Sequence, residues 1–473
     1  MLDDEKIRWM SALDLMRAYK AKEVSPVEVT ESILRTVEKV NPKVNAIVTL
    51  TDQLALEMAK ESESAYMNGN PRLLEGVPVT IKDLIVTKGI RTTYGSKLFE
   101  DCVPDVDAVL VERIRHAGGV ILGKTNVPEF GLIAVTDNLI FGPSRNPWDL
   151  LRTTGGSSGG AAAALACGFG PIAVGNDGGG SIRIPASLCG VFGLKPQFGR
   201  VPSYPHLVRG WETLNHEGPL SRTVADSALL LDVMAGSDDR DRFSLPEPNI
   251  SYLETLKAEI KGLKIAYTQD LSVDAVDKEV VEITRKAAGV FEDLGARVEE
   301  DDPGIPKMDM ELTTMVIVET FVAHEHHLSE AREKMFPLYK PLLDLADSFK
   351  ATDIVRANFK REDLWEKIRL FFERYDILLT PTTACAAFEL KEGGMLGPEM
   401  IDGKPVSPAS WVGFTFPFNF TGQPAASVPC GFTSEGLPVG LQIVGRRLDE
   451  QTVFRVARAF EEAKPWGDLH PPL

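Results

Sequence analysis

Residues 155–186 read GGSSGGAAAALACGFGPIAVGNDGGGSIRIPA, two serine-bearing glycine loops on either side of an alanine-rich stretch. Glycine loses more backbone entropy on folding than any other residue. A run this dense therefore indicates left-handed backbone angles or a close approach of the main chain to another group. Acyl transfer needs a nucleophile and N–H donors aimed at the oxyanion that forms. Serine hydroxyls beside bare backbone thus indicate a site for attack on a carbonyl.

The middle of this segment also predicts part of the fold. A flexible Gly/Ser linker is polar, whereas residues 161–174 form an apolar run that requires burial. We expect a helix of small residues over 158–167, a buried strand over 172–175 and a loop over 176–180.

Strand and helix patterns alternate along the rest of the chain. The expected strands are 77–81, 120–122, 190–194, 264–267, 296–299, 377–380, 425–429 and 439–444. The expected helices are one from Ser25-Pro26 to a stop at Asn41-Pro42, then 53–66, 107–117, 224–234, 276–294 and 449–463. This alternation predicts an α/β fold with a large mixed central β-sheet flanked by helices on both faces. We expect a single domain over 1–473, with 305–370 as a helical cap-like insertion.

Composition narrows the class of protein. The 473 residues are 44% hydrophobic and 25% charged, with a formal net charge of −17, which disfavours nucleic acid and anionic membranes as partners. The five cysteines are scattered without C-x-x-C spacing, which indicates reduced thiols and neither a disulfide framework nor a zinc site. The first residues carry no apolar signal segment, and no stretch has 18 uninterrupted apolar residues. These features predict a cytoplasmic protein without a membrane span.

Three short motifs have weak support from their surroundings. Residues 118–125 match the phosphate-loop formula, but their variable positions are an apolar strand preceded by a helix, so nucleotide binding stays a weak alternative. Residues 156–160 match G-x-S-x-G without the apolar strand that a nucleophile elbow needs. His324-Glu325-His326-His327 lacks the i, i+4 histidine pair of H-E-x-x-H, and we expect no metal site there.

Taken whole, residues 155–186 resemble the signature of the amidase signature family, whose pattern spans about thirty positions with fixed gaps. The resemblance extends upstream to 75–83, EGVPVTIKD, and downstream to 375–382, YDILLTPT, and 419–424, NFTGQP. It covers effectively the whole chain, and residues 305–370 match least.

The resemblance implies a Ser–cis-Ser–Lys triad and an acyl-enzyme. Lys82 is then the base, Ser157 the bridging serine on a cis peptide bond after Gly156, and Ser181 the nucleophile. An ammonium cannot accept a proton, so Lys82 can act only if burial lowers its pKa. The implied oxyanion hole consists of the main-chain N–H groups of Gly178, Gly179, Gly180 and Ser181.

Further residues have supporting roles in this scheme. We expect Ser158 to hydrogen-bond within the serine network, and Asp177 and Arg183 to hold the loop through charge-assisted bonds. Gly178 stands where relatives usually carry Thr or Ile, and we expect it to widen the pocket. The reaction, hydrolysis of a small-molecule amide, needs no metal or cofactor. A homodimer is an expectation from the family.

Two functions within the family remain open. One is a stand-alone amidase acting on aliphatic, aryl or cyclic amides. The other is the glutamine-hydrolysing subunit of the glutamyl-tRNA amidotransferase, which usually has an acidic residue before the position of Asn419. Residues 411–418, WVGFTFPF, are apolar here, and as a pocket wall they favour the stand-alone amidase. Alternatively these aromatic residues belong to the core.

Overall fold

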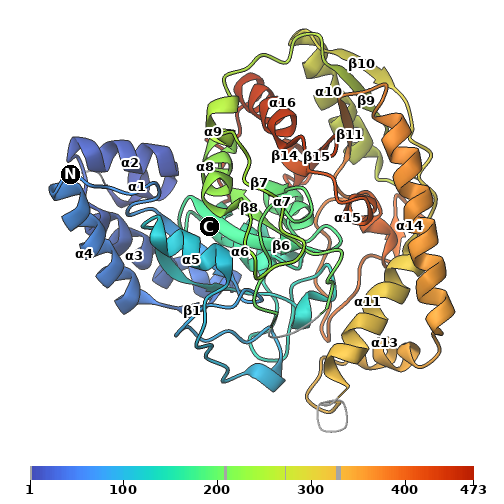
Figure 1. Ribbon diagram of the computed structural model, residues 1–473, viewed down its shortest axis with the longest axis horizontal. Coiled ribbons are helices and arrows are strands. Elements are labelled where there is room, and N and C mark those ends of the chain that lie inside the picture. The colour runs from blue at the N-terminus through green and yellow to red at the C-terminus, as the bar shows by residue number, and fades with distance from the viewer. Residues whose placement is uncertain (1–2, 207–209, 272, 326–331) are drawn as a thin grey trace.

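The computed structural model describes residues 3–206, 210–271, 273–325 and 332–473 (Figure 1). Within these ranges one large sheet contains β1 (Ile47–Leu50), β2 (Pro78–Lys82), β3 (Val120–Thr125), β6 (Ile172–Asp177), β7 (Phe192–Lys195), β8 (His216–Ser221), β9 (Lys264–Tyr267), β10 (Arg297–Glu300), β11 (Ile377–Pro381), β14 (Ala425–Phe432) and β15 (Pro438–Gly445). Their order is β1-β3-β2-β6-β8-β7-β14-β15-β11-β9-β10. Two small ribbons pair β4 (Arg145–Asn146) with β5 (Asp149–Thr153), and β12 (Met400–Ile401) with β13 (Lys404–Pro405).

Helices surround this sheet. The α-helices of the described ranges are α1 (Asp4–Trp9), α2 (Ala12–Ala21), α3 (Pro26–Val44), α4 (Asp52–Met67), α5 (Val109–His116), α6 (Gly159–Ala166), α7 (Arg183–Cys189), α8 (Val224–Met234), α9 (Tyr252–Thr255), α10 (Lys278–Asp293), α11 (Asp309–His324), α13 (Tyr339–Ala346), α14 (Ala351–Phe371), α15 (Pro417–Phe420) and α16 (Glu450–Ala463). Short 3₁₀ turns are η1 (Lys97–Phe99), η2 (Glu129–Gly131) and η3 (Ser410–Val412). None of these helices has the length and apolar character needed to cross a bilayer.

Alternate residues of β6 face two helical layers. Ile172 and Val174 belong to the largest core cluster, together with residues of α5, α8, α10 and α16, whereas Ala173 packs with α6 and α7. Helix α6 approaches its neighbours so closely that a Cβ on Gly160 would overlap the backbone of Asn126. The predicted α/β architecture, a large mixed sheet with helices on both faces, is confirmed.

The strand order brings the glycine loops to one edge of the sheet. Strands β2 and β6 are parallel neighbours, and β8 runs antiparallel beside β6. Lys82 ends β2, Asp177 ends β6 and pairs with His216, the first residue of β8. Ligands of α/β sheets bind outside the carboxyl ends of parallel strands, so this edge is the expected place for a site.

Most expected elements are present, and the structure explains where the others differ. Helix α8 and strand β9 have the predicted bounds. Helix α3 does not stop at Asn41-Pro42 but continues to Val44, with Pro42 inside its last turn. Strand β6 continues through Asp177 into the predicted loop, because β8 supplies a pairing partner. Strands β1, β5 and β8 and helix α7 were not predicted, and β8 in particular contains Gly218-Pro219, a turn signal in isolation.

The helices of the 305–370 region lie together on one side of the molecule. Helices α11, α13 and α14 fall in this region, away from the N-terminal helices α1 to α4 (Figure 1). Thr320 and His324 of α11 line the cavity described below. That the region is a cap-like insertion in a single domain stays a prediction.

Candidate active site

Ser157 and Ser181 line the same cavity at the carboxyl edge of the sheet. Its polar lining also includes Asn176 of β6 and Glu217 of β8. Apolar lining comes from Leu84, Ile85, Val86, Tyr94, Ala108, Leu110, Phe130 and Trp211. The cavity can therefore hold a ligand that is partly apolar and presents a polar group to the two serines.

Lys82 lies beneath the first glycine loop with its side chain fully buried. Its Nζ donates a hydrogen bond of 2.7 Å to Ser157 Oγ and one of 3.1 Å to the Asn176 carbonyl. Burial lowers the pKa of Lys82 to about 7, against the opposing effect of the negative charges of Glu217 and Asp177. A neutral amine, which can accept a proton, is thus available near neutral pH.

The two serine loops contact each other through the main chain. The peptide bond between Gly156 and Ser157 is cis. The N–H of Ser158 donates to the Ser181 carbonyl at 3.1 Å. Ser158 Oγ donates to the Asn176 carbonyl at 3.3 Å, not to either neighbouring hydroxyl. Among the described residues, Ser181 Oγ has no hydrogen-bond partner, so this hydroxyl is free at the cavity wall.

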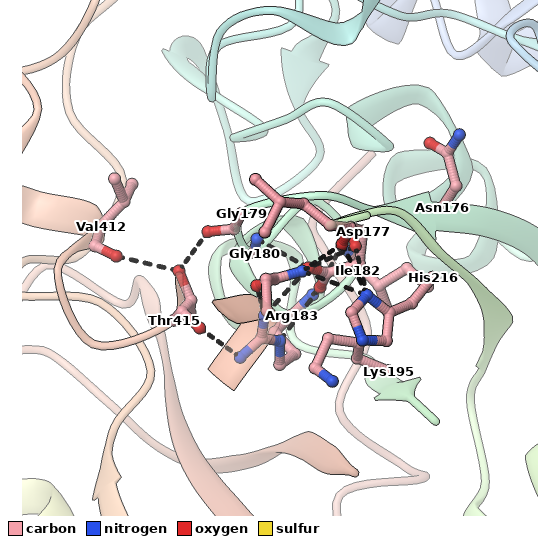
Figure 2. Close-up of polar contacts among 12 residues, drawn as sticks. Asn176, Asp177, Gly179, Gly180, Ile182, Arg183, Lys195, His216, Val412 and Thr415 are labelled. Carbon is pink, nitrogen blue, oxygen red and sulfur yellow. Dashed lines mark hydrogen bonds and ion pairs between the residues drawn. The ribbon is translucent and has the colours of Figure 1, made fainter. Parts of the chain in front are cut away.

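The Asp177 carboxylate organises the second glycine loop. Gly180 N–H donates to Asp177 Oδ1 at 2.7 Å and Ile182 N–H to Oδ2 at 3.1 Å. Arg183 adds a bidentate ion pair, Nε to Oδ2 at 3.0 Å and Nη2 to Oδ1 at 2.9 Å (Figure 2). Burial alone would raise the pKa of Asp177, but the Arg183 guanidinium holds this pKa well below its ordinary value. The carboxylate is therefore a permanent acceptor for the loop.

This arrangement corrects the predicted set of oxyanion donors. The Gly180 N–H points to Asp177, so it is not available to a ligand. The N–H groups of Gly178, Gly179 and Ser181 have no acceptor within the part of the chain that the structure describes. All three are therefore free to donate to an oxyanion, and Gly178 and Ser181 line the cavity.

Two polar residues that were not predicted to support the site connect this loop to the C-terminal part of the chain. Thr415 Oγ1 donates to the Gly179 carbonyl at 2.7 Å and to the Val412 carbonyl at 2.9 Å (Figure 2). Asn419 Nδ2 donates to the Asp177 carbonyl at 2.7 Å and to Asp177 Oδ1 at 2.9 Å. Asn419 belongs to the 419–424 motif, which was the only sequence signal for either residue.

Glu217 is a buried carboxyl group that the sequence did not single out. It pairs with Asn176 across β6 and β8, and its Oε1 accepts from Asn215 Nδ2 at 2.9 Å and Ser203 Oγ at 3.3 Å. Burial raises the pKa of Glu217 to about 7. The sequence carried no signal for this residue, because β8 was not predicted as a strand.

The predicted pocket wall at 411–418 is wrong. Trp411, Phe414 and Phe418 are fully buried, and no residue of 411–418 lines the cavity that contains the serines. The segment with η3 and α15 instead belongs to the core and contacts the loop of residues 177–181 through Thr415 and Asn419. The predicted widening at Gly178 is also wrong, because the indole of Trp211 occupies the space of a side chain there.

The weak motifs have structural roles. Lys124 of the 118–125 stretch lies fully buried in β3, where its Nζ donates to the Ile85 carbonyl and to Thr92 Oγ1, each at 2.6 Å. No phosphate can reach this lysine, so the nucleotide loop is excluded. His324 is buried and stacks on Phe130 with ring centroids 4.1 Å apart. Residues 326–327 lie outside the described residues, and among the described ones no cluster of metal-binding side chains occurs.

Comparison with known proteins places the chain in a family. The family model described as Amidase matches residues 28–454. The chain belongs to the amidase signature family. An acylamidase of Rhodococcus erythropolis is 39% identical and aligns with 99% of this amidase and 98% of its own length. A glutamyl-tRNA(Gln) amidotransferase subunit of Caldanaerobacter subterraneus subsp. tengcongensis is 37% identical, with 95% of each chain covered.

Solved structures agree with this assignment. A bacterial aryl acylamidase of the amidase signature family superposes with a TM-score of 0.91 at 35% identity, covering 97% of both chains. A 6-aminohexanoate cyclic dimer hydrolase superposes with a TM-score of 0.90 at 32% identity, covering 100% of this amidase and 99% of the hydrolase. The protein is an amide-hydrolysing enzyme that acts on small-molecule substrates.

Proposed function

We propose that this amidase cleaves amides through an acyl-enzyme on Ser181, with Lys82 as the base and Ser157 as the proton relay. The observation that carries the proposal is the 2.7 Å hydrogen bond from buried Lys82 to Ser157 Oγ, in the wall of the cavity that also holds the free Ser181 hydroxyl. A serine hydroxyl is a weak nucleophile until a base removes its proton. Among the described residues, Lys82 is the one amine that hydrogen-bonds to either of the two serines.

The reaction needs only the amide substrate and water. Neutral Lys82 takes the proton of Ser157 as Ser157 takes that of Ser181, and Ser181 Oγ bonds to the amide carbon. The carbonyl oxygen becomes an oxyanion that accepts from the N–H groups of Gly178, Gly179 and Ser181. The C–N bond then breaks, the amine leaves with the proton returned through Ser157, and water hydrolyses the acyl ester by the same relay.

We further propose a stand-alone amidase rather than an amidotransferase subunit. The support is the apolar lining of the cavity by Leu84, Ile85, Val86, Phe130 and Trp211, which suits a substrate with apolar groups. The similarity to an acylamidase and to an aryl acylamidase points the same way. A homodimer remains an expectation from the family.

Turnover of a substrate panel tests both proposals. The panel contains an aliphatic amide, a 4-nitroanilide and glutamine, each assayed with wild type, Ser181→Ala and Ser187→Ala. Ser187 is a matched control, since it is buried in α7 and its hydroxyl has no hydrogen-bond partner in the described structure. We expect anilide turnover to fall by about 10⁴- to 10⁶-fold in Ser181→Ala only. Undiminished turnover in that variant overturns the mechanism, and turnover of glutamine alone overturns the stand-alone assignment.

A further inference from the structure

Trp211 forms part of the cavity wall in an unusual backbone conformation. Its φ is +61°, in the left-handed region that bulky side chains rarely occupy. Its side chain lines the same cavity as Ser157 and Ser181. A conformation of this kind persists only where the surroundings hold it, and it is a reason to look for a function.

The turn that follows Trp211 is fixed from several directions. The Trp211 carbonyl accepts from the N–H groups of Leu214 and Asn215 at 3.0 and 2.8 Å. The Glu212 N–H donates to Glu319 of α11 at 3.0 Å. The turn is therefore attached to the helices of the 305–370 region.

Two further side chains hold the same turn. Arg361 of α14 donates to Thr213 Oγ1 and to the Thr213 carbonyl, each at 3.0 Å. The Leu214 carbonyl accepts from Asn419 Nδ2 at 3.2 Å. The same Asn419 amide contacts Asp177, so a single side chain braces the Trp211 turn and the nucleophile loop.

The indole of Trp211 packs directly on Gly178. A Cβ built on Gly178 would lie 2.5 Å from Trp211 Cε3 and 2.9 Å from Cδ2, too close for any side chain. Gly178 is not in the left-handed region, so the indole and not the backbone requires glycine there. A Cβ on the neighbouring Gly179 would meet only ordinary contacts, at 3.7 Å from Phe416 and 3.8 Å from Trp211.

We propose that Trp211 is a specificity-determining residue: its fixed indole, packed on Gly178, limits branching of the acyl group that becomes attached to Ser181. The inference rests on the proposed function, because it assigns the acyl group to this serine. The acyl group stays on Ser181 through both halves of the reaction while the loop binds its oxygen. A flat or unbranched acyl group fits beside the indole, whereas an acyl group with a quaternary carbon next to the carbonyl does not fit.

The first experiment compares two substrates with one leaving group, 4-nitroacetanilide and the 4-nitroanilide of pivalic acid. Trp211→Ala is expected to raise the pivaloyl-to-acetyl ratio of kcat/KM at least about tenfold, since even one methylene group in a pocket changes selectivity by about 10- to 200-fold. Trp211→Phe, which keeps a smaller flat ring, is expected to give an intermediate ratio and serves if the alanine variant does not fold. Ratios within twofold of wild type in both variants overturn the proposal.

The second experiment tests the packing of the indole on Gly178. We expect Gly178→Ala to lower kcat/KM for the acetanilide strongly, and the double variant Gly178→Ala/Trp211→Ala to recover at least tenfold relative to Gly178→Ala. Gly179→Ala is the matched control, and adding Trp211→Ala to it is expected to bring no recovery. Absence of recovery at position 178, or equal recovery at both positions, contradicts the proposed contact. Wild type that cleaves neither these anilides nor any amide of the substrate panel would instead contradict the proposed function.

Discussion

Lys82 has only two hydrogen-bond acceptors among the described residues, Ser157 Oγ and the Asn176 carbonyl, and neither carries a formal charge. A buried ammonium with neutral partners is poorly stabilised, so burial lowers the pKa of Lys82 to about 7. The absence of a bonded carboxylate therefore leaves this amine able to act as the base of the proposed mechanism.

The pH dependence of turnover follows from this pKa. The amine must be unprotonated to act, so kcat/KM is expected to rise as pH increases through about 7 and to level off above it. One pH unit below the pKa, the rate is expected to be about tenfold below the plateau. A profile of kcat/KM between pH 5.5 and 9.5 for a neutral anilide measures this rise, the acidic limb of the profile. A rate that is flat from pH 6 to 9 contradicts the role of Lys82.

Glu217 affects the pH at which the acidic limb of the kcat/KM profile lies. The pKa of Glu217 is about 7, and the ionised form of this group stabilises the Lys82 ammonium and raises the pKa of Lys82. Glu217→Gln is therefore expected to lower the pKa of Lys82 and to move the rise in kcat/KM to lower pH. Glu461→Gln is the matched control, because this buried glutamate lies on α16 and accepts from the Val224 N–H at 3.1 Å. A limb that stays in place in Glu217→Gln, or moves equally in both variants, shows that Glu217 does not act on Lys82.

At the scale of single residues, the motifs predicted which residues lie at the site, but the residues that reach it through tertiary contacts could not be predicted from the sequence. Lys82, Ser157 and Ser181 stand at fixed motif positions, and the structure places Lys82 against Ser157 and both serines at one cavity. Glu217 and Trp211 reach the cavity through the β6–β8 register and a left-handed turn. Neither feature is encoded in local sequence patterns.

At the scale of elements, the loop that carries Ser181 depends on the buried pair of Asp177 and Arg183. Replacing Asp177 by Asn removes the carboxylate that faces a fully buried guanidinium, and breaking such a pair costs about 3–5 kcal/mol. We expect this decrease in the free energy of unfolding, measured by urea denaturation, together with a loss of activity. Glu366→Gln, which breaks an exposed pair with Arg369 on α14, is the control and is expected to leave stability unchanged. Equal stability of Asp177→Asn and wild type contradicts this role.

Elements with a strong internal pattern were predictable, and elements made by pairing were not. The apolar run of β6 and the small-residue helix α6 were visible in the sequence. Strand β8 exists because β6 and β7 pair with its two edges, and its Gly218-Pro219 resembles a turn when read alone. The aromatic residues at 411–418 had the composition of a pocket wall or of a core, and only the tertiary structure separates the two.

At the scale of the whole molecule, Glu129 of η2 connects the chain before η1 to the chain beyond α11. Its Oε2 accepts from the Phe336 N–H at 2.6 Å and its Oε1 from Ser96 Oγ at 2.5 Å. Burial raises the pKa of Glu129 from 4.5 to about 7. The folded protein therefore binds a proton here that the unfolded chain releases at lower pH.

This linkage predicts how stability changes with pH. A carboxyl group whose pKa is raised by folding contributes stability below pH 4.5, and this contribution is lost as pH rises through about 7. Glu129→Gln cannot titrate, so the decrease in the free energy of unfolding between pH 5 and 8 is expected to be smaller in the variant than in wild type. Urea denaturation at the two pH values measures the difference. An identical decrease in both proteins contradicts a raised pKa at Glu129.

The decisive measurement is the site at which a fluorophosphonate, which reacts with activated serines, modifies the enzyme. Peptide mass mapping is expected to show one adduct, on Ser181, with a labelling rate that rises through the same pH limb as turnover. Lys82→Ala is expected to label far more slowly, since the hydroxyl loses its base. An adduct on Ser157 or Ser158 alone, or turnover and labelling that persist in Ser181→Ala, would contradict the mechanism.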